Sequence, residues 1–155
     1  MATPDFVLAL REKIGHDELW LPGVTAVVLR GPELLLVRRA DSGAWTPVTG
    51  IVDPGEEPAV AAEREVLEEA DVVAHVESLA WVKVIDTVTY ANGDRSRYLD
   101  LVFRCSWVSG DPFPADGENT EAAWFRLDAL PRLSEDMSSR IRVAVECAEA
   151  ARFER

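Results

Sequence analysis

Carboxylates that could bind a metal ion are concentrated in the segment EREVLEE, residues 63–69. Glu65, Glu68 and Glu69 would share one side of a helix, because residues three and four positions apart are neighbours on a helical surface. Each like-charged pair at this spacing costs roughly 0.2–0.5 kcal/mol. A divalent cation such as Mg²⁺ or Mn²⁺ would reverse that repulsion, and such ions share carboxylate oxygens with substrate phosphates. The residue types therefore fit a metal–phosphate site, although a segment of this kind taken alone is more often a solvated acidic helix face.

The residues around these carboxylates predict how they are held. Pro58 suits a first helical turn, and the alanine-rich run that follows predicts a helix over residues 58–70. Arg64 stands four residues before Glu68 and eight after Glu56. We expect its guanidinium to orient Glu68 and to tie the preceding loop to the helix.

The wider pattern resembles the signature of the Nudix hydrolase family. The matching positions are Gly50, Glu56, Arg64, Glu65, Val66, Glu68, Glu69 and Val72. Roughly one random window in 10⁷ would carry the fixed identities of this pattern. The signature has a helix-ending glycine where this chain has Asp71, and aspartate tolerates positive φ better than most residues. Thr49 and Asp53 also differ from the residues common in the family, but neither replaces an implied metal ligand.

The resemblance implies a metal-dependent hydrolase that cleaves a pyrophosphate bond in a nucleoside diphosphate linked to another moiety. Its implied Mg²⁺ or Mn²⁺ ligands are the Gly50 carbonyl, Glu65, Glu68 and Glu69. Arg64 and Glu56 would organise them, and relatives often add a carboxylate from a later loop, for which Glu118 is favoured over Glu121. The general base stays open among Glu65, Glu69 and a loop carboxylate. A Nudix domain that senses a nucleotide without hydrolysing it is the alternative, although the intact glutamate set argues against it.

Four residues outside the signature are candidates for binding the substrate. Arg38 and Arg39 end a predicted strand, and strand alternation predicts that only one of them points inward. Trp45 lies five residues before Gly50, and Tyr90 lies at a hairpin turn marked by Asn92-Gly93. The substrate class stays open among nucleoside triphosphates, ADP-ribose-like compounds, nucleotide sugars and dinucleoside polyphosphates.

The remaining pattern predicts an α+β fold in a single domain over residues 1–155. Helices are expected over residues 4–14 and 135–152, with Met137, Ile141, Val145 and Ala148 of the second facing inward, and strands over 23–29, 33–39, 74–90, 96–108 and 122–127. The resemblance implies a Nudix α/β/α sandwich with a mixed sheet and a catalytic loop-helix-loop. The apolar stripe of the first helix either packs on its own domain or forms a homodimer contact.

The amino-acid composition of the chain narrows the classes of binding partner to expect. A formal charge of −12 argues against non-specific binding to nucleic acids or anionic membranes, so a small nucleotide-type substrate is expected. Local arginines must then hold its phosphates, and the candidates are Arg38, Arg39, Arg95, Arg97 and Arg104. Cys105 and Cys147 form no paired motif, which favours buried reduced thiols. With neither a long apolar run nor a signal peptide, the sequence predicts a cytoplasmic protein.

Overall fold

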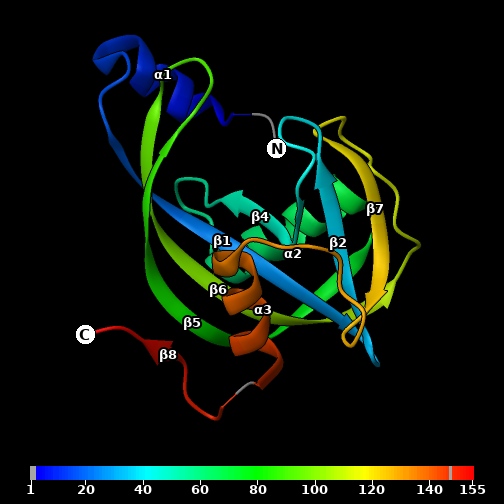
Figure 1. Ribbon diagram of the computed structural model, residues 1–155. Helices are drawn as coiled ribbons and strands as arrows, with labels where there is room; N and C mark the ends of the chain where they lie inside the picture. Colours follow the sequence, from blue (N-terminus) through cyan, green and yellow to red (C-terminus); the bar gives the residue numbers. More distant parts are fainter. Residues whose placement is uncertain (1–2, 147) are drawn as a thin grey trace.

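The computed structural model describes residues 3–146 and 148–155. The chain forms, in order, α1 (Asp5–Ile14), β1 (Leu19–Arg30), β2 (Glu33–Arg39), β3 (Trp45–Thr46), β4 (Val48–Ile51), α2 (Pro58–Ala70), β5 (Val73–Thr89), β6 (Arg95–Ser109), β7 (Asn119–Arg126), α3 (Glu135–Glu146) and β8 (Arg152–Phe153). Figure 1 shows the long β5–β6 hairpin curving up to α1 and α3 lying across the sheet.

The strands form a mixed sheet in the order β3-β2-β1-β6-β5-β8, with β4 also paired to β1 and β7 to β2. The parallel pairing of β1 with β6 lies at its centre, and most other pairs are antiparallel. The hairpin expected between β1 and β2 is short, since only Leu29↔Leu34 and Arg30↔Glu33 pair. Beyond those pairs β2 takes β7 as its partner, while β1 takes β4. The predicted α+β class with a mixed sheet is confirmed.

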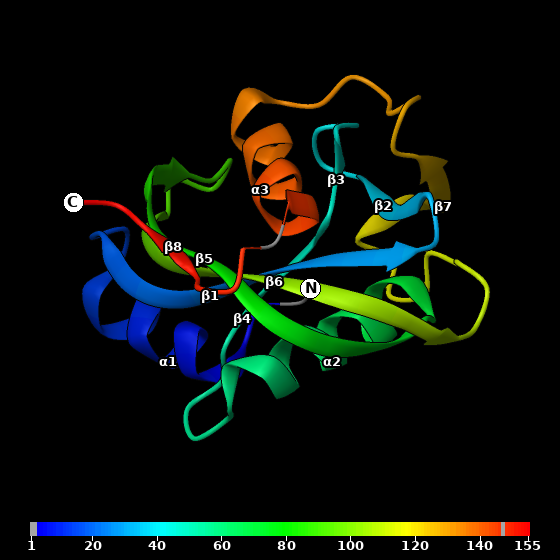
Figure 2. The same ribbon diagram turned by 90° about the horizontal axis from the view of Figure 1, so that it is seen from below.

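Each face of the sheet buries its own hydrophobic cluster. Along β2, Leu35 and Val37 join the cluster beneath α2, while Leu34 and Leu36 join the cluster beneath α3. This alternation follows from the two-residue period of a strand. The two helices therefore cover opposite faces, as Figure 2 shows, and the layered arrangement expected from the sequence is present.

Helix α2 has the bounds that its sequence predicts. Pro58 occupies its first turn, and the helix ends at Asp71, whose φ of 53° and ψ of 31° are left-handed. Among the described residues other than glycine, Asp71 alone has positive φ. The backbone N–H of Asp71 donates to the Leu67 carbonyl, so the turn forms without the signature glycine.

The C-terminal helix is shorter than predicted. Helix α3 starts after a Ser134 cap, whose hydroxyl accepts from the Met137 N–H, but it ends at Glu146 instead of continuing to residue 152. Ile141 is buried as expected, whereas Ala148 lies beyond the helix and is exposed. Cys147 lies outside the described residues.

The reason for the early end is visible at the sheet edge. Strand β8 pairs in parallel with Trp81 and Val82 of β5, and so satisfies backbone groups that an edge strand leaves open. Residues 148–150 are exposed and offer a helix no apolar face to bury.

Helix α1 packs on its own chain through one side. Val7 is buried with Leu21 and Ile51, while Leu8 and Leu10 of the same helix are 50% and 38% exposed. Cys105 is a buried free thiol, as expected. Within residues 3–146 and 148–155 no helix is both long and apolar enough to cross a membrane.

The left-handed end of α2 gives a stability prediction. Asp71→Ala should lower the free energy of unfolding by about 1 kcal/mol, because an L-residue with Cβ and no local side-chain hydrogen bond resists this conformation. Asp71→Gly should be at least as stable as the parent. Urea unfolding of the three proteins measures both effects, and an alanine variant more stable than the glycine variant would contradict the assigned turn.

Candidate metal and phosphate site

The site is built on the contact between Gly50 and Glu65. Gly50 is the last residue but one of β4, where it pairs with Val24, and Glu65 lies on α2 with only 1% of its surface exposed. A Cβ placed on Gly50 would lie 2.3 Å from Glu65 Cδ. Only glycine therefore lets the strand end and the carboxylate lie this close together.

Arg64 joins the loop to the helix as the sequence predicts. Its Nε and Nη2 donate to the two oxygens of Glu56 at 2.8 and 2.9 Å. Its Nη1 donates to Glu65 Oε1 at 2.9 Å and to Glu68 at 3.2 Å. The Glu56 carboxylate in turn accepts from the Asp53 N–H at 3.1 Å. One guanidinium thus fixes the loop and two of the three clustered glutamates.

The Glu65 carboxylate is poised for a cation. Burial raises its pKa to about 7; the Arg64 charge opposes the shift, and the charges of Glu69 and Glu68 add to it. Oxygen Oε1 is bonded to Arg64, whereas the buried Oε2 has no hydrogen-bond partner among the described residues. A buried carboxylate oxygen without a partner is costly, and a hard metal ion would satisfy it. The donor set fits a divalent cation.

Glu69 forms the other half of the site. It is 2% exposed, and its Oε2 accepts a hydrogen bond from Asn119 Nδ2 at 3.1 Å. Oxygen atoms of Glu69, Asp116 and Glu118 lie within 4.8 Å of one another. Burial is the largest cause of a raised Glu69 pKa; the Asn119 hydrogen bond opposes it, and the Asp116 charge reinforces it.

The loop before β7 delivers these partners by docking on the end of α2. Phe113 N–H donates to the Ala70 carbonyl at 2.9 Å, and Ala115 N–H donates to the Glu69 carbonyl at 3.3 Å. Carbonyls at a helix C-terminus have no partner within the helix, so the loop satisfies them. The sequence pattern predicted Glu118 as a site residue of this loop but did not indicate Asp116 or Asn119. Their positions depend on this docking, which no local pattern announces.

Comparison with known proteins supports the same assignment. The NUDIX domain family model matches residues 19–145. This chain belongs to the Nudix family. A "MutT-like protein" of Streptomyces ambofaciens is 33% identical over 127 residues, which cover 81% of this chain and 77% of that protein. Enzymes of the family hydrolyse phosphorus-containing anhydrides, which is the class of reaction expected from the sequence.

A longer relative and a solved structure are also similar to this chain. The "NAD-capped RNA hydrolase NudC" of Pseudomonas aeruginosa (strain LESB58) is 36% identical over 115 residues, or 72% of this chain. The chain spans only 38% of the length of that relative. A crystal structure of a NUDIX hydrolase from Nitrosomonas europaea superposes with a TM-score of 0.68 at 22% identity, covering 86% of this chain and 76% of that one.

The Nudix glutamates do not all face one point. Glu65 turns to Gly50 and Arg64, and Glu69 turns to Asn119 and the loop. The side chain of Glu68 is 52% exposed beside Arg64. Buried and exposed carboxylates therefore border the site from different sides. Glu121, the less favoured loop candidate, pairs with Arg38 at 2.7 Å.

The four substrate-binding candidates separate into two groups. Arg39 is half-buried, is paired with Asp41 at 2.8 Å, and has a pKa raised first by that hydrogen bond and further by the charges of Glu69 and Tyr90. Both groups are therefore close enough to influence its charge. Arg38 points to the opposite face, as alternation predicts, where it borders an open hollow of about 690 Å³ together with Trp45. The Trp45 ring packs edge-on against Phe125 in the cluster beneath α3.

The other arginines proposed to hold phosphate have structural partners. Arg104 donates to the Ala144 and Val145 carbonyls at the end of α3. Arg97 donates to Thr87 and Glu18, and Arg95 reaches the His16 carbonyl at 3.5 Å.

The close approach of Gly50 predicts a severe substitution. Gly50→Ala should lower metal affinity at least tenfold and reduce stability, because the new methyl group occupies the space of the Glu65 carboxylate. Calorimetric Mn²⁺ titration and thermal unfolding measure the two effects. Adding Glu65→Ala should restore the lost stability without restoring metal binding, and equal stability losses from Gly50→Ala in both backgrounds would show that no clash exists.

The raised Glu65 pKa predicts pH-dependent metal binding. Below about pH 7 the carboxyl is protonated in the metal-free protein, so an incoming cation must displace that proton. Affinity for Mn²⁺ should increase as the pH rises from 6 to 8 and level off above the Glu65 pKa. The folded-state pKa of Glu65 exceeds its ordinary value, so in the metal-free protein the protonated carboxyl stabilises the folded state. This contribution is lost as the pH rises through about 7. Calorimetry across this range should show the trend, and Glu65→Gln should abolish it.

Proposed function

We propose that this protein is a metal-dependent pyrophosphohydrolase that cleaves the P–O–P linkage of a nucleoside diphosphate joined to another moiety. The observation that carries the proposal is the buried Glu65 carboxylate, which lies against Gly50 with Oε2 unpaired. Glu69, with Asp116 and Glu118 nearby, supplies a second group of oxygens. Such an oxygen set suits Mg²⁺ or Mn²⁺.

The proposed ligands are the Gly50 carbonyl, Glu65, Glu68 and Glu69. When bound, a divalent ion polarises phosphoryl oxygens and makes a coordinated water more acidic. Arg64 occupies Glu65 Oε1, which leaves Oε2 as the oxygen available to a cation. Asn119 Nδ2 donates a hydrogen bond to Glu69 Oε2 and so orients that carboxylate. These hydrogen bonds preorganise the carboxylates before substrate arrives.

In the proposed reaction a water oxygen forms a bond to phosphorus while the bridging P–O bond breaks. The water proton passes to a carboxylate, and the electron pair of the broken bond leaves with the departing phosphate. The candidate bases are Glu65, Glu69 and Glu118. The buried Oε2 of Glu65 has no hydrogen-bond partner among the described residues, and Glu69 and Glu118 belong to the group of carboxylates that includes Asp116. The base stays a prediction among these three.

Arg39 is proposed to bind a substrate phosphate. Its guanidinium is partly exposed and lies where the charge of Glu69 influences it. A fixed cation at this point counteracts the −12 formal charge that would otherwise repel a polyphosphate. Trp45 and Arg38 lie on the other face of the sheet from Glu69. Their role as substrate contacts stays a prediction.

The substrate panel follows from the sequence pattern and from the named relatives. One relative is named for NAD-capped RNA, and NAD itself contains a pyrophosphate bond, so NAD belongs in the substrate panel beside nucleoside triphosphates, ADP-ribose and dinucleoside polyphosphates. NAD-capped RNA belongs there too, although the acidic charge led us to expect small substrates. Single-domain organisation, a cytoplasmic location and a possible homodimer also stay predictions.

Hydrolysis of this panel with Mg²⁺ tests the proposal. Glu69→Gln should lower kcat by about 10²-fold or more on the best substrate, because it removes a charge that acts at the reacting phosphate. Glu63→Gln is the matched control: it removes a carboxylate from the same helix, keeps an acceptor for the Val76 N–H, and should leave kcat unchanged.

Product analysis by chromatography decides between enzyme and sensor. Tight metal-dependent nucleotide binding without product from any substrate would favour a nucleotide-sensing module. An unchanged rate in Glu69→Gln would show that the metal site is elsewhere.

A further inference from the structure

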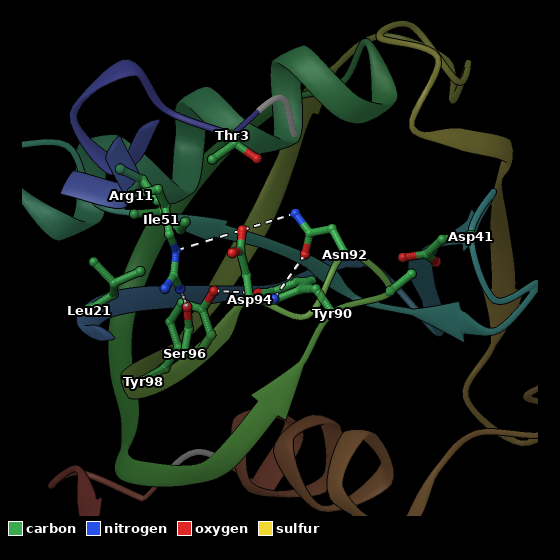
Figure 3. Close-up of a pocket in the computed structure, with 12 residues that line it drawn as sticks. Thr3, Arg11, Leu21, Asp41, Ile51, Tyr90, Asn92, Asp94, Ser96 and Tyr98 are labelled. Carbon is green, nitrogen blue, oxygen red and sulfur yellow. Dashed lines mark hydrogen bonds and ion pairs between the residues drawn. The ribbon is translucent and has the colours of Figure 1, made fainter. Parts of the chain in front are cut away.

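A pocket of about 330 Å³ lies between α1 and the tip of the β5–β6 hairpin. Its apolar wall consists of Val7, Leu21 and Ile51, which form a small buried cluster. Figure 3 shows this wall facing the polar side chains of the hairpin. The family match begins at residue 19, so α1 lies outside the matched residues.

Arg11 fastens α1 to the hairpin. Its side chain is only 10% exposed, and its two terminal nitrogens donate to the carbonyls of Gly15, Asp17 and Arg95 and to Ser96 Oγ. Its Nε lies 3.6 Å from the Asp94 carboxylate, toward which it points in Figure 3. These contacts fix the helix that closes one side of the pocket. Arg11 is thus a positioning residue for the pocket wall.

The pocket adjoins the proposed reaction site at two points. Ile51 lines the pocket and directly follows Gly50, so their Cα atoms are about 3.8 Å apart. Asp41 lies at the opposite rim and holds Arg39, the arginine proposed to bind phosphate. A substrate with its phosphates at Gly50 and Arg39 would therefore extend one end into this pocket.

We propose that the pocket between α1 and the hairpin is the subsite for the nucleoside that the reaction leaves unchanged, with α1 and Tyr90 setting its selectivity. This inference rests on the proposed hydrolase function. The volume is at the lower end of the range of about 300–1,000 Å³ for ligand pockets, which suits one nucleoside. Tyr90 is 41% exposed as a residue and its hydroxyl is hydrogen-bonded to that of Tyr98, so a fixed aromatic surface is available to a base.

The charges of the pocket exclude a further phosphate. Two carboxyl groups of the pocket have lowered pKa values: that of Asp94, chiefly because of its hydrogen bond with His16, and that of Asp41, chiefly because of its hydrogen bond with Arg39. Both are ionised at neutral pH. Arg11 is the arginine that faces Asp94, and its hydrogen bonds are committed to the helix end and the hairpin, whereas Arg39 faces Asp41. Carboxylate acceptors suit ribose hydroxyls and base N–H groups and repel phosphate. The occupant is therefore the uncharged end of the substrate.

Two substitutions test the subsite from opposite sides. Tyr90→Ala removes the aromatic surface, and Thr3→Trp fills the pocket mouth from the exposed segment before α1. Each should raise KM for nucleoside-bearing substrates about tenfold or more with kcat changed less than about twofold, because the altered contacts touch a group that does not react. Leu8→Ala, on the outer side of the same helix, should match the parent protein.

Inorganic tripolyphosphate gives a second readout, because it carries phosphates without a nucleoside. Its inhibition constant should be the same in all variants if the pocket binds the nucleoside. Tyr90→Phe keeps the ring and should keep the parental KM, which separates loss of the aromatic surface from loss of the fold. Parental KM values in both Tyr90→Ala and Thr3→Trp, or losses in kcat alone, would overturn the subsite.

Calorimetric binding of AMP without metal reads the pocket independently of turnover. Parent protein and Leu8→Ala should bind AMP, and Thr3→Trp should bind it about tenfold more weakly. If the parent hydrolyses nothing while this difference persists, the hydrolase proposal fails and the subsite stands. If the parent hydrolyses the panel but AMP binding ignores Thr3→Trp, the subsite fails and the hydrolase stands.

Discussion

The contact of buried Glu65 with Gly50 is the constraint on which the rest of the site depends. A carboxylate with 1% exposure is unfavourable unless something compensates it, and Arg64 compensates one oxygen only. The same guanidinium also donates two hydrogen bonds to Glu56, so the loop between β4 and α2 is fixed relative to the helix. Without a side chain at residue 50, the backbone of β4 can approach that carboxylate this closely.

The sequence predicted the local half of this arrangement well. The bounds of α2 and the contacts of Arg64 with Glu56 and Glu68 depend on residues within one loop and one helix, where helical spacing decides which side chains meet. Strand alternation likewise separated Arg38 from Arg39. Trp45 shows the limit of this reasoning, because closeness in sequence to Gly50 does not decide which face its ring packs on. The ring lies against Phe125 of β7, which is distant in sequence.

What the sequence missed depends on long-range contacts. Asp116 and Asn119 reach Glu69 only because their loop docks on α2, and the pocket exists only because α1 lies against a hairpin more than eighty residues away in sequence. The predicted C-terminal helix was longer than the observed α3 for a similar reason. Helix propensity continues past Glu146, but the open edge of β5 offers β8 backbone partners that an unsupported helical turn lacks.

The end of α2 links the two halves of the site. Asp71 adopts the left-handed conformation that turns the chain away, and Gly110 lies against it so closely that a Cβ there would be 2.6 Å from the Asp71 carbonyl oxygen. This approach allows the loop to cap the helix through the N–H groups of Phe113 and Ala115. The cap in turn holds the loop carboxylates opposite Glu69. The signature position occupied by Asp71 therefore acts on the site through the backbone: it sets where α2 stops, and so where the loop can bring its acidic side chains.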